Sequence, residues 1–351
     1  VSMILVASKD QNMSKNKEIG SEFWLEQSPS SLSTDRDGVY VLSGRTAIDV
    51  IIQDIMSYKQ IKSVYLPAYC CDSMIFPFTN KGIEVKLYDV SFDGELHYHI
   101  DNNVNCDIFY VTNYFGYDNT INNSVIEHFK KNGSIIIYDK THSFFMDNDD
   151  LKCDYSFASI RKWMGVIGGA IVLGVKESKL NEYPYLKCKE QAMREKKAYL
   201  DGNTNISKES FLQKYNEFGH HLTDDYSNYE MDDLSYTIYK NTDLSSIRKI
   251  RINNSQYLHD NLGIEFLCKM TDNACPLFVP VIFKTKEKRD FVRKTLIDNQ
   301  IYCPIHWPKS KLILPEMKVN KIFDTELSLI CDQRYDIKDM HKIVNIIKSV
   351  N

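Results

Sequence analysis

Asp139 and Lys162 are ionisable side chains next to predicted strands, and together they have the chemistry needed to form and use a Schiff base. A partly buried carboxylate such as Asp139, which ends the apolar run 135–138, needs a cationic partner to stay ionised, and a protonated pyridine nitrogen would supply it. A lysine among apolar neighbours has a lowered pKa, which favours attack on a carbonyl group. Each residue alone also fits a simpler role, Asp139 as a turn cap and Lys162 as a surface lysine.

The segment 43–48 has the composition of a phosphate site at the start of a predicted helix. Small and hydroxylic residues at a helix N-terminus leave backbone N–H groups free for a phosphate, and Arg45 adds a counter-charge. Ser43 alone is more typical of an ordinary helix cap. The glycines at 165, 168 and 169 let the backbone after Lys162 pass close to a ligand.

The elements that would position these groups alternate between strands and helices. Apolar runs predict strands at 64–66, 85–88, 107–111, 134–138 and 170–173. Between them, helical patterns occupy 47–59 and 124–131. Short apolar strands alternating with helices predict an α/β fold with a mostly parallel central sheet flanked by helices.

The second half of the chain predicts surface helices and then a smaller α+β domain. Charged helical patterns fill much of 176–225, and an amphipathic helix begins near 240. The later elements are predicted as a strand at 277–283, a helix at 288–299, a strand from 301 and a helix at 340–350. We therefore expect a poorly ordered leader (1–21), a large cofactor-binding domain (22–240) and a small C-terminal domain (241–351).

Composition excludes several classes of protein. The 351 residues carry 43 Lys and Arg against 47 Asp and Glu, and this net charge of −4 argues against sequence-independent nucleic-acid binding. The nine cysteines include no CxxC pair, which excludes zinc-ribbon and thioredoxin-like sites, and their scatter is typical of a reducing compartment, so we expect a cytoplasmic protein. No apolar run approaches the length of a membrane span.

Other catalytic and metal-binding motifs are missing from the sequence. It has no GxGxxG, no Walker-type phosphate loop and no GxSxG elbow. The histidines at 97, 99, 220 and 221 have no obvious third ligand beside them, so they are interpreted as surface or packing residues, and no metal is predicted.

Taken together, the motifs resemble those of the DegT-like sugar aminotransferases, which are fold type I pyridoxal-phosphate enzymes. The resemblance runs from about residue 22 to the end. It is carried by SGRTAI at 43–48, LPAYCCDS at 66–73, NYFG at 113–116, YDKTHS at 138–143, SFASIRKW at 156–163, GG at 168–169, NYEM at 228–231, IHWP at 305–308 and DQRY at 332–335.

The resemblance implies roles for the two ionisable groups and for the helix start. Lys162 would hold the aldehyde of pyridoxal 5'-phosphate as a Schiff base, and Asp139 would pair with the pyridinium nitrogen. His142 would lie near the ring hydroxyl. The phosphate would be held by Gly44, Arg45 and Thr46, with help from either Ser156 or Ser159.

This chain departs from the family pattern at three positions. The family usually has an aromatic ring over the cofactor at the position of Cys71, so either Tyr69 stacks on the ring or the ring lies against sulfur. The serine-to-lysine interval is one residue shorter in the family than from Ser156 to Lys162, which leaves both serines as candidates. Glu230 stands where the family often has Arg, which would alter recognition of an anionic substrate.

The resemblance also implies a shared site and a reaction. Asn228 would reach the phosphate of the neighbouring subunit in a homodimer, and His306 and Trp307 would face the substrate. The implied function is transfer of an amino group from glutamate or glutamine to a keto sugar, linked to a nucleotide. The alternatives are another pyridoxal-phosphate enzyme (a lyase, dehydratase or racemase), a catalytically retired sugar-binding protein of this fold, or an unrelated two-domain α/β protein. Some related dehydratases have His in place of the lysine, so Lys162 favours transamination.

Overall fold

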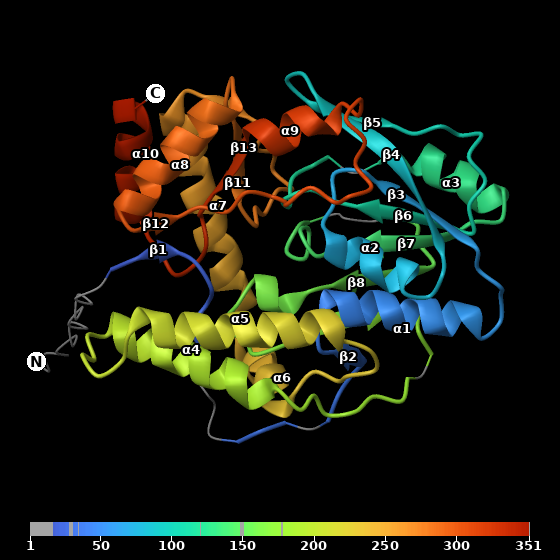
Figure 1. Ribbon diagram of the computed structural model, residues 1–351, viewed down its shortest axis with the longest axis horizontal. Coiled ribbons are helices and arrows are strands. Elements are labelled where there is room, and N and C mark those ends of the chain that lie inside the picture. The colour runs from blue at the N-terminus through green and yellow to red at the C-terminus, as the bar shows by residue number, and fades with distance from the viewer. Residues whose placement is uncertain are drawn as a thin grey trace, which may run out of the picture.

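The computed structural model describes residues 17–27, 31–33, 35–119, 121–147, 151–176 and 178–350. Helices lie on both faces of a central sheet, and a smaller group of strands and helices lies beside it (Figure 1). The helices are α1 (Gly44–Met56), α2 (Asp72–Thr79), α3 (Asn123–Lys131), α4 (Leu186–Leu200), α5 (Lys208–Asp224), α6 (Asp233–Asn241), α7 (Leu244–Leu262), α8 (Lys286–Asp298), α9 (Val319–Thr325) and α10 (Ile337–Val350).

The central sheet has eight strands in the order β2-β9-β8-β7-β6-β3-β4-β5. Their bounds are β2 (Val39–Val41), β3 (Ser63–Pro67), β4 (Glu84–Phe92), β5 (Leu96–His99), β6 (Ile108–Thr112), β7 (Ile135–Asp139), β8 (Tyr155–Ala158) and β9 (Ala170–Leu173). Strands β4, β3, β6, β7 and β8 are parallel to one another. At the two margins of the sheet, β5 pairs antiparallel with β4, β9 pairs antiparallel with β8, and β2 pairs antiparallel with β9. The predicted α/β fold class with a mostly parallel sheet is confirmed.

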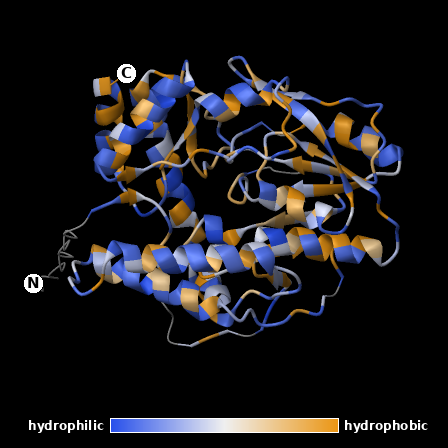
Figure 2. Ribbon diagram, in the orientation of Figure 1, coloured by the Kyte–Doolittle hydropathy of each residue, from blue (hydrophilic) through white to orange (hydrophobic). Residues whose placement is uncertain are grey.

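Two apolar layers cover the central sheet, one on each face. Successive side chains of a strand point to opposite faces, so Val64 and Leu66 pack with α1 and α2, whereas Tyr65 packs with α3. Strands β3 and β6 in the middle of the sheet are accordingly buried along their whole length, and hydrophobic stretches lie among the central strands (Figure 2). This coverage leaves the carboxyl ends of the parallel strands as the edge where polar side chains gather.

The smaller group of strands lies in the C-terminal part. Its sheet has the antiparallel order β10-β11-β13, and a parallel pair joins β1 to β12. The bounds are β1 (Ile19–Gly20), β10 (Glu265–Phe266), β11 (Val279–Ile282), β12 (Ile301–Tyr302) and β13 (Glu326–Leu329). Side chains of α7, α8 and α10 pack with these strands in one buried cluster. The predicted domain boundary between residues 240 and 241, which falls at the end of α6, stays a prediction.

The end of the predicted leader takes part in this smaller group. Residues 1–16 lie outside the described residues, but Ile19 pairs with Ile301 and is buried. Gly20 has a φ of +90°, and a Cβ there would lie 2.4 Å from the carbonyl oxygen of Tyr302, so glycine is required for this pairing. Strand β1 therefore fixes the position of residues 21–24, which follow it directly.

The predicted charged helices are α4 and α5, which lie side by side (Figure 1). The Arg45 guanidinium at the start of α1 donates from Nη1 to the carbonyl oxygen of Leu222 near the end of α5, at 2.7 Å. This contact brings α5 over the start of α1. Within the described ranges, no helix is both long enough and apolar enough to cross a membrane.

Candidate active site

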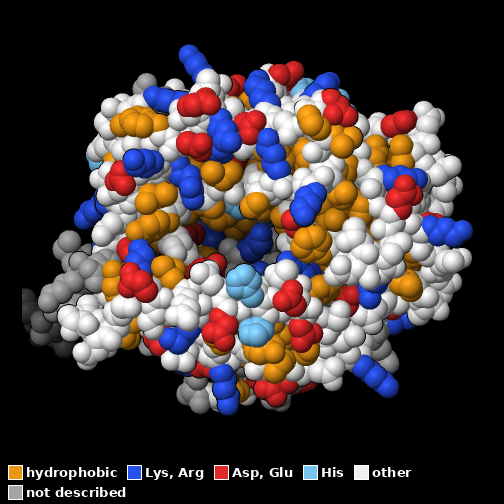
Figure 3. Space-filling view, in the orientation of Figure 1, with side chains coloured by type: hydrophobic (Ala, Val, Ile, Leu, Met, Phe, Trp, Pro, Cys, Tyr) orange, Lys and Arg blue, Asp and Glu red, His pale blue; other side chains and the backbone are white. Residues whose placement is uncertain are grey.

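A cavity of about 200 Å³ lies at the carboxyl end of β7, where the start of α1, the start of α2 and one side of α5 meet. A space-filling view shows a hollow near the middle of one face of the molecule, with Lys and Arg side chains inside it (Figure 3). The carboxyl edge of a parallel sheet is where α/β proteins bind ligands. The cavity is therefore our candidate active site.

Asp139 closes β7 and its side chain lines the cavity. The residue is only 6% exposed, and its carboxylate accepts hydrogen bonds from the Tyr110 hydroxyl and the Thr141 backbone N–H, both at 2.8 Å. Burial raises the pKa of this carboxyl, although these hydrogen bonds oppose the rise. A cationic group in the cavity would stabilise the carboxylate, as a protonated ring nitrogen does.

Lys162 is the last residue of a 3₁₀ turn, η1 (Ile160–Lys162), between β8 and β9, and it lines the same cavity. Burial lowers the pKa of its ammonium group, although the negative charge of Asp139 opposes this. Across the described ranges, no group accepts a hydrogen bond from Lys162 Nζ, so its amine is available to a bound molecule.

The start of α1 forms one end of the cavity. Ser43 is the N-cap and accepts a hydrogen bond from the Thr46 N–H, so the Gly44 and Arg45 N–H groups remain at the open end of the helix. Ser159 lies close by, because a Cβ on Gly44 would be 3.5 Å from the Ser159 Cβ. Among the described residues, the buried Ser159 hydroxyl and Arg45 Nε have no hydrogen-bond partner, and an anion at this helix end would supply one.

The structure brings eight of the thirteen predicted site residues to this cavity. They are Gly44, Arg45, Cys71, Asp139, His142, Ser159, Lys162 and Trp307. The other five do not line it. They are Thr46, Tyr69, Ser156, Asn228 and His306.

Ser156 and Thr46 face other groups. Ser156 is on β8 and its side chain points to the opposite face from that of Phe157, whose ring lines the cavity, so Ser156 lies near Cys153 instead. Thr46 pairs its hydroxyl with Ser43 at 2.9 Å. Of the two candidate serines, the structure thus brings Ser159 to the helix end.

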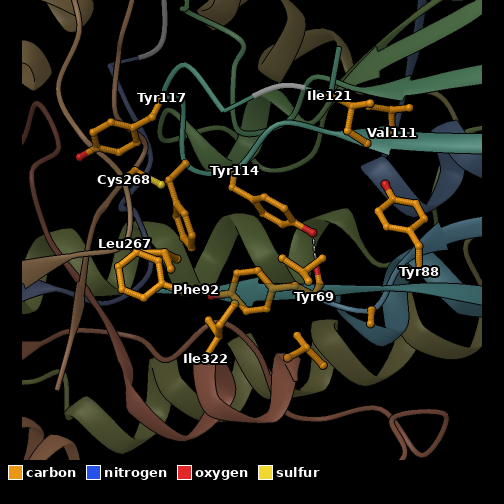
Figure 4. Close-up of a cluster of buried hydrophobic side chains, with 14 of the residues drawn as sticks. Tyr69, Tyr88, Phe92, Val111, Tyr114, Tyr117, Ile121, Leu267, Cys268 and Ile322 are labelled. Atoms are coloured by element: carbon orange, nitrogen blue, oxygen red, sulfur yellow. Dashed lines mark hydrogen bonds between the residues drawn. The ribbon is translucent and has the colours of Figure 1, made fainter. Parts of the chain in front are cut away.

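Tyr69 does not flank the cavity. Its ring is fully buried beside the Tyr114 ring, with 5.0 Å between the centroids (Figure 4). The centroid of the Trp307 ring is also 5.0 Å from that of Tyr69. The Tyr114 hydroxyl also donates to the Tyr69 carbonyl oxygen at 2.7 Å, which holds this segment in place. Cys71, two residues later, lines the cavity, and a cofactor ring against its sulfur stays a prediction.

His142 and Trp307 form a flat wall of the cavity. The centroids of their rings are 5.5 Å apart, and the ring planes are inclined to each other by 28°. His142 Nδ1 accepts a hydrogen bond from the Phe115 N–H at 3.2 Å, and burial holds the pKa of the imidazole well below its usual range, so the ring is neutral. A neutral flat wall of this kind suits a planar aromatic ligand.

Asn228 and His306 lie elsewhere. Asn228 has a φ of 60° and accepts a hydrogen bond from Gln53 Nε2 at 2.9 Å, and its reach into a neighbouring subunit stays a prediction. His306 lines a second cavity, which also contains Lys162. Its backbone N–H donates to Glu326 and its Nδ1 lies 2.8 Å from the Ser328 hydroxyl.

Several residues around the cavity were not predicted from the sequence. Glu22 forms an ion pair with Lys189 of α4 at 3.2 Å, and the charges of Lys189 and then Arg161 lower the pKa of Glu22 to about 2. Arg161 directly precedes Lys162, and its position in the SFASIRKW motif was the one available signal. The charges of Arg45, Arg161, Lys162 and Lys189 outnumber those of Asp139 and Glu22, so the cavity favours an anion.

The described residues contain no group of three or more His, Cys, Asp or Glu side chains that could hold a metal ion.

Comparison with known proteins supports the fold. No protein-family model matches the chain, and no curated protein matches it in sequence. Among solved structures, the aminotransferase PseC of Helicobacter pylori, involved in pseudoaminic acid biosynthesis, has a TM-score of 0.66 over 95% of this chain and 99% of its own, at 11% identity. NtdA of Bacillus subtilis, with bound cofactor PMP, has a TM-score of 0.62 over 89% and 72%, at 13% identity.

A third similar structure is DesI, solved in the presence of its TDP-sugar product. It has a TM-score of 0.60 over 91% of this chain and 81% of its own, at 11% identity. At such identities the likeness establishes the fold. The chain shares the fold of these aminotransferases, as the family resemblance of its sequence implied.

Proposed function

We propose that the chain is a pyridoxal-phosphate-dependent sugar aminotransferase of the DegT-like kind. One observation carries the proposal: Asp139 and the Lys162 amine face one cavity whose far end is the open helix start with the unpartnered Ser159 hydroxyl. The names of similar structures, among them a PMP-bound protein and one with a TDP-sugar product, support a sugar substrate. We further propose glutamate or glutamine as amino donor and a nucleotide-linked keto sugar as acceptor.

The residues of the cavity fit this cofactor. The Gly44 and Arg45 N–H groups and the Ser159 hydroxyl would bind the phosphate, and the buried Asp139 carboxylate would accept a hydrogen bond from the ring nitrogen. Lys162 Nζ would bind the aldehyde carbon. The ring would lie between Cys71 and the flat wall of His142 and Trp307, which suits the planar shape of pyridoxal.

The chain's own residues would then move and hold protons. Pyridoxal phosphate, when bound, supplies an aldehyde that takes up amines and a ring that withdraws electrons from the neighbouring carbon. Lys162 Nζ, with its lowered pKa, would take a proton from the donor's α-carbon as general base and deliver it, as general acid, to the carbon that came from the cofactor aldehyde. The Asp139 carboxylate would keep the ring nitrogen protonated. Trp307 and Phe218 would exclude water from the cavity.

The first experiment is a visible spectrum of the purified protein with added pyridoxal phosphate. We expect an absorption band of the Schiff base, which L-glutamate should bleach. A screen of nucleotide-linked keto sugars with L-glutamate would then identify the acceptor by mass spectrometry of the aminated product. Protein that is correctly folded but forms no such band would contradict the proposal.

A substitution at Ser159 should weaken cofactor binding, while the same change at Ser156 should not. A hydrogen bond to a charged group contributes about 1.5–3 kcal/mol, so Ser159→Ala should raise the dissociation constant of pyridoxal phosphate by about 10- to 100-fold. Ser156→Ala is the matched control, because its hydroxyl faces Cys153. Fluorescence titration of the apoprotein measures both constants, and a larger effect at Ser156 would reverse the assignment.

The proposed enzyme works as a homodimer in which Asn228 reaches the phosphate of the neighbouring site, and the nine free cysteines support a cytoplasmic location. Asn228→Asp should weaken cofactor binding, because it places a negative charge near the phosphate while Asp tolerates the positive φ. Mixed dimers of Asn228→Asp and Lys162→Ala subunits should regain activity, because one site per dimer is intact. Mixed dimers as inactive as Lys162→Ala alone would contradict the shared site.

A further inference from the structure

A second cavity of about 450 Å³ adjoins the candidate active site. Glu22, Arg161 and Lys162 line both cavities. The other walls come from residues 21–23, which follow β1, and from the C-terminal part, including Phe278 and His306. A molecule held here lies next to the Lys162 amine without occupying the phosphate end of the first cavity.

Two of the three arginines along the second cavity are already used in the fold. Arg334 donates from Nε and Nη2 to the Asp332 carboxylate, both at 2.8 Å. Arg251 donates to the carbonyl oxygen of Leu277 at 3.0 Å and to the Gln333 side chain at 2.9 Å. Neither guanidinium needs a ligand to satisfy it.

Arg161 differs from both. Its Nε is buried without a partner, and in the part of the chain that the structure describes its guanidinium makes no hydrogen bond or ion pair. Glu22, whose negative charge acts on Arg161, is within ion-pair distance of Lys189 instead. A buried guanidinium without a partner is costly, and a bound anion would remove that cost.

We infer that Arg161 binds the α-carboxylate of the amino-acid donor in this second cavity, an inference that rests on the proposed function. The cofactor phosphate is the other possible anion, but its cradle of Ser43, Gly44 and Ser159 does not line the second cavity. The α-carboxylate is attached to the carbon that must approach Lys162 Nζ. Because Arg161 is adjacent to Lys162 in one 3₁₀ turn, its position suits binding of the α-carboxylate better than binding of the donor's distal carboxylate.

Binding of unreactive donor analogues to the holoenzyme tests this inference. 2-Hydroxyglutarate and lactate both have an α-carboxylate but no amine, and calorimetry measures their affinity. Arg161→Gln should weaken both by about 30-fold or more, because it removes a charge-paired hydrogen bond. Arg161→Lys should weaken binding of the two analogues less than Arg161→Gln does. In both variants the dissociation constant of pyridoxal phosphate, measured by fluorescence titration, should change less than threefold. Arg248→Gln, at an exposed ion pair with Asp147, is the control and should change none of these.

Each contrary outcome has a distinct meaning. Unchanged analogue binding in a folded Arg161→Gln holoenzyme would overturn the inference alone. A loss for 2-hydroxyglutarate but not for lactate would assign Arg161 to the distal carboxylate, and an equal loss of cofactor affinity would assign it to the phosphate; either overturns the inference. Wild-type protein that binds no pyridoxal phosphate would contradict the proposed function, and this inference with it.

Discussion

Replacing Lys162 with alanine should lower transamination by a factor of about 10⁴ or more, because one change removes both the group that binds the aldehyde and the group that moves the proton. Steady-state turnover of L-glutamate with the identified keto sugar measures the loss. The loss should not come from unfolding, because Lys162 Nζ makes no hydrogen bond within the described ranges.

Borohydride reduction provides the second measurement for Lys162. Reduced wild-type holoenzyme should carry the cofactor mass on the peptide that contains Lys162, and the alanine variant should carry none there. Lys197→Ala is a suitable control, because that lysine pairs with Asp201 on the exposed side of α4 and should leave turnover unchanged. Parent-rate turnover by Lys162→Ala, or an unmodified Lys162 peptide in loaded wild-type protein, would contradict the assignment.

Replacing Asp139 with asparagine should lower turnover by about 10²- to 10³-fold, the second-largest effect we expect. Asparagine keeps the size of the side chain but cannot compensate the charge of a protonated ring nitrogen, and loss of one partner of a buried ion pair costs about 3–5 kcal/mol. The ring would then withdraw electrons less strongly. Single-turnover bleaching by L-glutamate measures this step directly.

The control for Asp139 is Tyr110→Phe, which removes one hydrogen bond to the carboxylate and leaves its charge. This variant should lose about tenfold or less, in line with one lost hydrogen bond. Equal losses in Asp139→Asn and Tyr110→Phe would show that the hydrogen-bond network, and not the charge, is what matters. Unchanged turnover in Asp139→Asn would contradict the pairing with a ring nitrogen.

The local sequence pattern was sufficient for the framework of the site. The apolar run before Asp139 predicts a buried strand, and a chain that alternates such strands with helices must place their carboxyl ends along one edge of a sheet. Ser43 followed by an amphipathic pattern likewise predicts where α1 begins. These conclusions depend on residues close in the chain, so periodicity and capping determine them.

The tertiary structure decided which further residues line the cavity around Asp139, Lys162 and the start of α1. The choice between Ser156 and Ser159 at the helix end depends on where β8 stops and η1 begins. The choice between Tyr69 and Cys71 at the cavity depends on an aromatic cluster built from distant segments. Glu22 reaches the site because β1 pairs with β12, nearly three hundred residues away. The sequence by itself determined which groups can do the chemistry, because residue type and local periodicity are read along the chain. Tertiary packing decided which groups surround them, because those contacts join segments that no local pattern connects.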